Sequence, residues 1–228
     1  MRVGCSLGDK RSPALKTVTY TSVDIETLGP APGLHSMISL GAAAFNETGD
    51  LLDSQQWNLL PIPGTEPDPK TSKFWMAQPP EILQRATENA LDPAVAMPLF
   101  NAWCRSFPGH KICIAWPAAW DYAFVFHYLI RFVGNSPFGH SALDIKSLLF
   151  ALTGQFRSKK HLPQKVRTEL TNRPHTHVAV EDAIEQGEIF FALKRRLEVL
   201  RIENQNVTSL LTNGRNPRVT ASPDTQGG

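Results

Sequence analysis

Residues 17–27, with the sequence TVTYTSVDIET, constrain the fold more than any other stretch of the chain. The run is rich in β-branched and aromatic residues, which is typical of a strand. Successive side chains of a strand point to opposite faces, so Asp24 and Glu26 share one side while Ile25 enters the core. Two carboxylates this close repel each other unless one is protonated or a cation lies between them. The pattern indicates either a strand end that caps a turn or part of a Mg²⁺ or Mn²⁺ site.

The remaining strands and helices follow from hydrophobic spacing and turn residues. The apolar run 37–45 is followed by the hairpin-turn sequence NETGD and a return strand at 51–60, which predicts three consecutive antiparallel strands. Further short strands are expected at 111–115 and 142–144. Helices are expected from residue 81 and over 98–103, 121–133, 145–152 and 180–201. The proline-rich segment 61–80 is expected to hold no more than a short turn. This order predicts an α/β fold with a mixed sheet.

Length and composition describe an ordinary globular protein. A chain of 228 residues suits one domain, and 42% hydrophobic with 19% charged residues is typical of a soluble protein. The net charge of +2 is too small to indicate a polyanion partner, so any basic surface would have to be local. Three unpaired cysteines and no apolar run of ~20 residues favour a soluble, cytoplasmic protein. We expect a flexible arm at 1–15, a folded domain at 16–202 and a disordered tail at 203–228.

Two later positions place acidic groups where a metal site could be completed. Asp121 follows Trp120 at the head of an apolar helix, where an N-cap role would equally explain it. Asp182 lies in the first turn of the last helix, where favourable electrostatics with the helix dipole would suffice. His177 precedes Asp182 by a separation that corresponds to ~140° around a helix. We therefore expect His177 in the loop before the helix, free to swing over the site.

The order of these three stretches resembles a known group of nucleases. VDIET, then WD at a helix start, then HVAVEDA is similar to the DEDDh 3′-5′ exonucleases, the DnaQ-like or RNase T-like enzymes. The family motifs are D-x-E-T, an Asp that opens a helix after an aromatic residue, and H-x-A-x-x-D-A. The resemblance spans about residues 17–200 and implies a ribonuclease H-like mixed sheet flanked by helices. The segment 74–79 and the FGH sequence at 138–140 look more like the bacterial and phage exoribonuclease branch.

The resemblance also implies a chemistry for the acidic residues. In the family, four carboxylates hold two divalent cations, Mg²⁺ or Mn²⁺, which stabilise the attacking and leaving oxygens of a phosphodiester. The matching residues of this chain are Asp24, Glu26, Asp121 and Asp182. His177 would take the proton from the attacking water, a role suited to imidazole near neutral pH.

Substrate contacts are expected beside the acids. By resemblance, Thr27, Leu28 and Trp120 would hold the terminal nucleotide, although an apolar Leu28 is also ordinary core. The basic segment 155–175 is either a phosphate-binding loop or a solvated surface. Trp75 and Trp116 are candidates for base stacking or for burial.

The implied activity is metal-dependent 3′-5′ exonucleolytic hydrolysis of single-stranded ends, RNA favoured over DNA. A DNA-directed exonuclease, a short-oligonucleotide hydrolase and a catalytically silent nucleic-acid-binding module are the alternatives, and a homodimer stays open. Pro117 stands where many family members carry Asn, so a contact at the second motif is made differently here.

Overall fold

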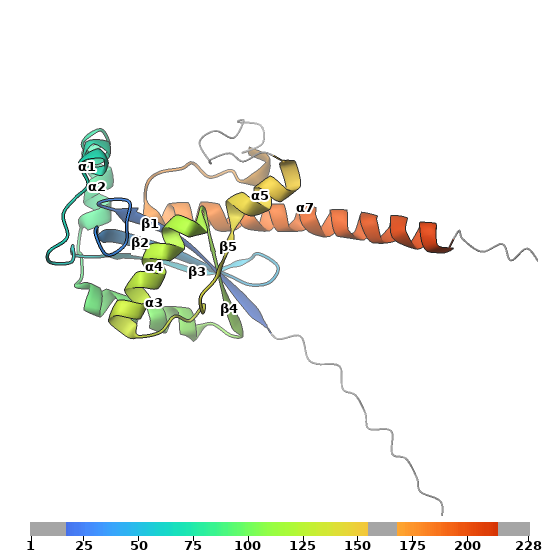
Figure 1. Cartoon of the computed structure of the whole chain (residues 1–228), viewed down its shortest axis with the longest axis horizontal. Coiled ribbons are helices and arrows are strands. Elements are labelled where there is room, and N and C mark those ends of the chain that lie inside the picture. Colours follow the sequence, from blue (N-terminus) through green and yellow to red (C-terminus); the bar gives the residue numbers. More distant parts are fainter. Residues whose placement is uncertain (1–16, 155–167, 214–228) are drawn as a thin grey trace, which may run out of the picture.

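A five-stranded mixed sheet forms the centre of the molecule (Figure 1). The computed structural model describes residues 17–154 and 168–213, with side chains described as far as 205. The strand order is β3-β2-β1-β4-β5. The strands are β1 Val18–Thr27, β2 Met37–Phe45, β3 Leu51–Asn58, β4 His110–Ala115 and β5 Ala142–Asp144. The first three pair antiparallel, and β4 and β5 continue the sheet parallel to β1, which confirms the predicted mixed sheet.

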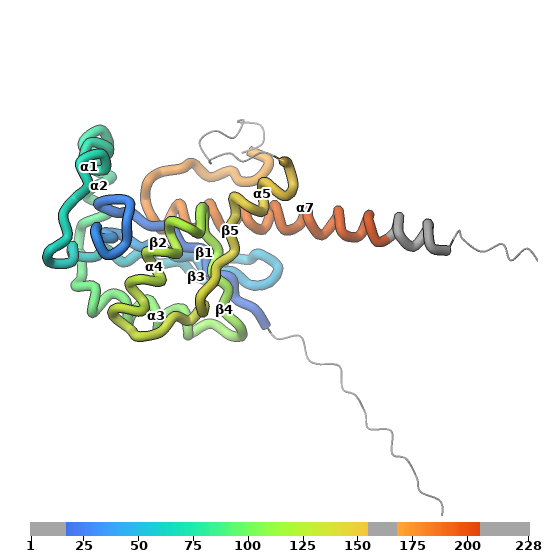
Figure 2. Tube along the Cα trace, in the orientation of Figure 1, coloured from blue at the N-terminus to red at the C-terminus, as the bar shows by residue number. Residues whose placement is uncertain are grey.

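Helices cover both faces of this sheet. α3 Pro93–Ser106 and α4 Ala118–Val133 pack on the face to which Val23 and Ile25 of β1 point. α5 Ile145–Thr153 and α7 Ala179–Asn213 cover the opposite face, and α7 continues past the sheet (Figure 2). α1 Pro69–Met76 and α2 Pro80–Thr87 lie beyond the end of β1. None of the helices in the described ranges combines the length and apolar character needed to span a membrane.

Two glycines allow α7 to lie directly on β2. A Cβ added to Gly41 would lie 2.0 Å from the backbone carbon of Ala179, and one added to Gly187 would lie 2.1 Å from the ring of Phe45. Gly41 is also the register partner of Asp24 on the neighbouring strand. The missing side chain at Gly41 therefore lets the first turn of α7 approach the sheet beside Asp24.

Two helix starts differ from the sequence prediction, which took the prolines of 61–80 as breakers and Pro98 as the first residue of a helix. α1 begins at Pro69 inside the segment expected to be irregular, since Asp68 caps two backbone N–H groups of its first turn. α3 begins at Pro93 after the cap Asp92, so the predicted start at Pro98 is wrong. The Asp-Pro pair supplies both a side-chain cap and a preset φ, and Pro98 is accommodated inside the helix.

The ends of α4 and α7 also differ from the prediction. α4 has Pro117 as its N-cap residue, so Asp121 lies in the first turn and is not the cap. Asp144 caps α5, and its second oxygen accepts a bond of 2.7 Å from the backbone N–H of Ala118.

α7 runs to Asn213, so the predicted domain end at residue 202 falls within a continuous helix. The expected arm at 1–15, most of the basic segment, at 155–167, and residues 214–228 lie outside the described residues.

Candidate active site

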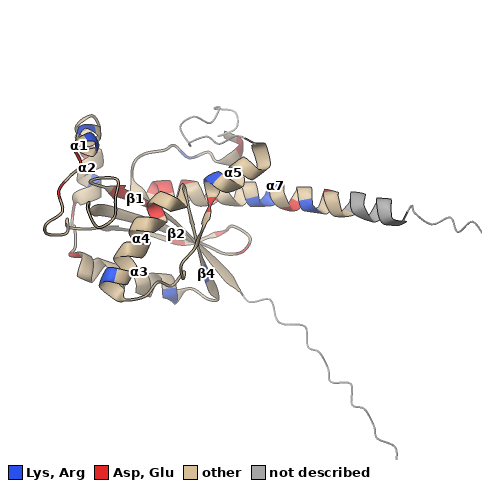
Figure 3. Ribbon diagram, viewed as in Figure 1, with Lys and Arg blue, Asp and Glu red and all other residues tan. Residues whose placement is uncertain are grey.

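Three carboxylates from two elements meet at the end of the sheet. Asp24 and Glu26 come from β1 and Asp182 from the first turn of α7. One carboxylate oxygen from each lies within 4.8 Å of the other two. The residues are only 9%, 8% and 0% exposed, respectively. Figure 3 shows acidic residues at the end of β1 and the beginning of α7. Like charges buried this close together favour protonation or a bound cation.

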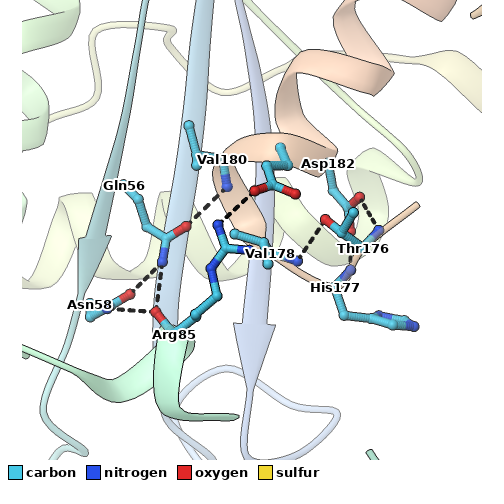
Figure 4. Close-up of polar contacts among 9 residues, drawn as sticks. Gln56, Asn58, Arg85, Thr176, His177, Val178, Val180 and Asp182 are labelled. Atoms are coloured by element: carbon cyan, nitrogen blue, oxygen red, sulfur yellow. Dashed lines mark hydrogen bonds and ion pairs between the residues drawn. The ribbon is translucent and has the colours of Figure 1, made fainter. Parts of the chain in front are cut away.

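Asp182 also organises the loop that leads into α7. Its Oδ1 accepts a bond of 3.0 Å from the backbone N–H of Thr176, and its Oδ2 accepts one of 3.0 Å from that of His177 (Figure 4). The Nδ1 atom of His175 lies 2.9 Å from the same Oδ2. His177 lies before the helix, as expected, with φ of 57° in the left-handed region. Its backbone is held by Asp182, and the expected movement of its side chain over the site stays a prediction.

The His177 ring lies beside two other rings. Its centroid is 5.4 Å from that of Phe74 in α1 and 4.5 Å from that of His175. Ligand atoms of His175, His177 and Asp182 also lie within 4.8 Å of one another. The imidazole of His177 is therefore close to Asp182 and packs against the rings of Phe74 and His175.

The sequence analysis missed two buried polar residues of α7. Glu185 and Gln186 are both 0% exposed. The Nε2 atom of Gln186 donates to Oδ1 of Asp24, and Nδ1 of His175 lies 3.5 Å from Oε2 of Glu185. Glu185 and Gln186 lie three and four positions after Asp182, respectively, on the same helix face. This spacing was the signal available in the sequence.

Asp121 lies at the same end of the sheet as this group but does not belong to it. It is 3% exposed, in the first turn of the helix that follows β4. Because β4 runs parallel to β1, the start of α4 lies at the same end of the sheet as Asp24. Asp121 also lies near Cys113, whose pKa is raised well above its usual value by burial and further by the charges of Cys104 and Asp121. Within the described residues, the metal-capable groups found do not include Asp121.

A pocket of about 290 Å³ opens beside Glu26. Its lining residues are Ile25, Glu26, Thr27, Lys70, Thr71, Phe74, Trp75 and Trp120. Trp120 is 38% exposed, so its ring is available to a ligand. Trp75 is buried and donates its indole N–H to the carbonyl of Thr27 at 3.0 Å. Leu28 does not line the pocket and packs against Ile38 and Trp75.

The comparison with protein families decides the identity. A family model described as the 3′-5′ exoribonuclease Rv2179c-like domain matches residues 19–193. The chain belongs to this family of 3′-5′ exonucleases. The chain is 29% identical over 196 residues to the 3′-5′ DNA exonuclease Cap18 of Escherichia coli, and this alignment covers 81% of the chain and 96% of Cap18. The predicted kinship with DnaQ-like 3′-5′ exonucleases is thereby confirmed.

Solved structures of exonuclease I have the same fold as this Rv2179c-like domain. The zinc-bound complex of Escherichia coli ExoI with single-stranded DNA superimposes with a TM-score of 0.61 at 15% identity, over 79% of this chain and 41% of that one. Apo exonuclease I gives a TM-score of 0.59 at 16% identity, over 86% of this chain and 47% of that one. This chain thus spans less than half the length of these structures. The likeness confirms the predicted ribonuclease H-like fold.

Proposed function

We propose that this domain is a metal-dependent exonuclease that shortens single-stranded nucleic acids from the 3′ end, with RNA as the first candidate substrate. The observation that carries the proposal is the meeting of Asp24, Glu26 and Asp182 within 4.8 Å in a largely buried position. Burying several carboxylates together is costly without a compensating charge. A cation-binding role accounts for this arrangement.

The donor atoms fit a hard divalent cation. All three groups offer carboxylate oxygens, the ligands that suit Mg²⁺ and Mn²⁺. Asp24, Glu26 and Asp182 would hold the cations, and Asp121 at the head of α4 is the proposed fourth ligand. When bound, two such cations stabilise charge on the attacking and leaving oxygens of the phosphodiester.

His177 is the proposed proton acceptor. Its imidazole can take a proton from a water molecule at the scissile phosphate, and a positioned base of this kind accelerates hydrolysis by about 10²–10⁴-fold. Two features support the role. The backbone of His177 is fixed by Asp182, and its ring lies beside Phe74 and His175.

The pocket beside Glu26 is the proposed site of the terminal nucleotide. Its volume of about 290 Å³ is near the lower end of the range of ~300–1,000 Å³ for small-ligand sites, which suits one nucleotide better than a duplex. Phe74 and Trp120 offer aromatic faces for base stacking. Lys70 offers a cation for phosphate, and Thr27 a hydroxyl for the sugar.

The sugar preference depends on contact with the 2′-hydroxyl. RNA stands first because the matching family is described as an exoribonuclease domain. DNA is the second candidate, since Cap18, which this chain matches over nearly all of Cap18's length, is a DNA exonuclease by name.

The test is digestion of matched RNA and DNA oligomers that carry a 5′ label. With Mn²⁺, wild-type protein should produce a ladder that shortens from the 3′ end one nucleotide at a time, faster on RNA. A chelator should stop the reaction, and Asp24→Asn should be inactive in parallel. Internal cuts, or equal activity in chelator, would contradict the proposal. Faster digestion of DNA would assign the second candidate, and a length series would reveal a short-oligonucleotide hydrolase.

A further inference from the structure

An ion pair connects α2 to the first turn of α7, next to the acidic group. Arg85 Nη2 donates to Glu181 Oε1 at 2.6 Å, with the two side chains 49% and 38% exposed (Figure 4). This bond holds the pKa of Glu181 below its usual value, and a hydrogen bond from the Thr176 side chain lowers it further. Glu181 therefore ties the first turn of α7, which also carries Asp182, to α2.

The Arg85 end of this pair is anchored to the sheet. The backbone carbonyl of Arg85 accepts bonds from Gln56 Nε2 at 3.0 Å and Asn58 Nδ2 at 2.9 Å, both from the edge strand β3. Gln56 Oε1 also accepts a bond of 3.2 Å from the backbone N–H of Val180. Gln56 thereby satisfies one of the free N–H groups at the start of α7 and links this helix to α2 (Figure 4).

At the Glu181 end, the neighbouring residue Asp182 accepts a hydrogen bond from the backbone of His177. Thr176 donates its backbone N–H to Asp182, and its Oγ1 accepts a bond of 3.3 Å from the backbone N–H of Val178. The residues on both sides of His177 are thus held by the side chains of Thr176 and Asp182. Glu181 precedes Asp182 in the first turn of α7, and its ion pair with Arg85 connects this turn to a separate helix.

We propose that Arg85, through Glu181, is a positioning residue that holds the 175–178 loop so that His177 stays over the carboxylates. The proposal rests on the proposed nuclease function, because it assigns the loop a part in hydrolysis. A displacement of about 1 Å in a catalytic group can cost on the order of 100-fold in rate. An ion pair this exposed contributes little to global stability, so its removal leaves the fold intact.

A kinetic test separates positioning from substrate binding. Arg85→Ala and Glu181→Gln should each lower kcat by about 10-fold with KM unchanged, and Arg85→Lys should keep most of the rate. The matched control is Arg196→Ala, which removes the pair Arg196–Glu169 of 2.9 Å and similar exposure, 48% and 46%, on the distant part of α7. This control should behave as wild type.

If Arg85 instead binds substrate phosphate, Arg85→Ala will raise KM at constant kcat. Glu181→Gln will then lower KM, because it frees the guanidinium. Either result overturns the positioning role.

Amide hydrogen exchange tests the loop without any substrate. The amides of Thr176 and His177 should exchange about 10-fold faster in Arg85→Ala than in wild type, and unchanged in Arg196→Ala. Equal exchange in Arg85→Ala and wild type would overturn the proposal. A wild-type protein that does not shorten single strands would instead refute the proposed function, and the exchange measurement would still decide whether Arg85 holds the loop.

Discussion

Asp182 combines two tasks in one carboxylate. It belongs to the acidic group, and it accepts backbone N–H bonds from Thr176 and His177, each at 3.0 Å. A proposed metal ligand that also fixes the adjacent loop cannot be removed without structural consequence. Substitutions at this position must therefore separate the loss of charge from the loss of hydrogen bonding.

We predict that Asp182→Asn and Asp182→Ala both abolish hydrolysis but differ in stability. The asparagine retains an acceptor oxygen for the loop, whereas alanine leaves two backbone donors without their partner. Each unsatisfied buried donor costs about 1–3 kcal/mol. Urea unfolding of the chelator-treated proteins should show the alanine variant as the less stable. Equal stability of the two variants would mean that the loop does not depend on Asp182.

Asp24→Asn should lower activity without lowering stability. We expect hydrolysis to fall by at least about 100-fold, in line with the loss of a catalytic electrostatic group. In chelator, the thermal midpoint should equal or exceed that of wild type, because the substitution removes one of several buried like charges. Added Mn²⁺ should then raise the midpoint of wild type but not of the variant. A variant that is stabilised by Mn²⁺ as strongly as wild type would contradict a ligand role for Asp24.

At the residue scale, the sequence was informative where charge and spacing coincide. Asp24 and Glu26 are two residues apart in one strand, and this spacing alone predicts that both lie on the same face. Gln186 was missed because its spacing from Asp182 has meaning only once Asp182 is assigned to the site, and its partner, Asp24, lies far away in the sequence. Of the two roles left open for Asp121, the helix cap is excluded because α4 begins at Ala118 with Pro117 as its cap.

At the scale of elements, the placement of α7 depends on contact with β2. Glycine at position 41 lets the backbone of Ala179 approach, and this contact sets the height of Asp182 above the sheet. A side chain there would meet backbone atoms, which cannot rotate away. The interface between β2 and α7 therefore positions the site, although Gly41 has no side chain that could take part in the chemistry.

We predict that Gly41→Ala lowers both stability and activity. Overpacking of this kind costs about 1–3 kcal/mol, and the displaced helix would carry Asp182 away from Asp24. Gly187→Ala is the comparison, because its Cβ would meet the ring of Phe45, a side chain, further along α7. At equal loss of unfolding free energy, Gly41→Ala should lose more activity. An active Gly41→Ala variant would show that α7 can shift without opening the site.

Some elements were predicted correctly and others were missed, for a physical reason. The strand at 37–45 and the following turn were found because a buried apolar run and a hairpin turn each have local signals. α1 and the start of α3 were missed because proline opens a helix as readily as it breaks one. The preceding residues, Asp68 and Asp92, are what decide between the two.

At the scale of the whole molecule, the packed core protects the two described cysteines. Cys104 and Cys113 are both 0% exposed, and burial raises the pKa of each thiol well above its usual value. A raised pKa means less thiolate at pH 8, so both should resist alkylation in the native protein. Peptide mapping should find them unmodified until denaturant is added. Fast labelling of Cys113 in the native state would show that the core beside Asp121 opens.

The whole fold was predicted better than its details because three motifs, far apart in sequence, together indicate one family. The family in turn implies one arrangement of the sheet and helices. The mixed sheet brings β1 and the start of α7 together, although Asp24 and Asp182 are distant in the chain. The extent of α7 was not predictable, because the residues after Glu203 lack the apolar periodicity that marks a packed helix.

Direct titration of Mn²⁺ into the purified protein tests the central claim, that acids from β1 and α7 form one cation site. Calorimetry should show saturable binding to wild type, and Asp24→Asn, Glu26→Gln and Asp182→Asn should each weaken it by at least about 10-fold, since each removes one charged ligand. Undiminished binding to any one of these folded variants would place that residue outside the site and contradict the account.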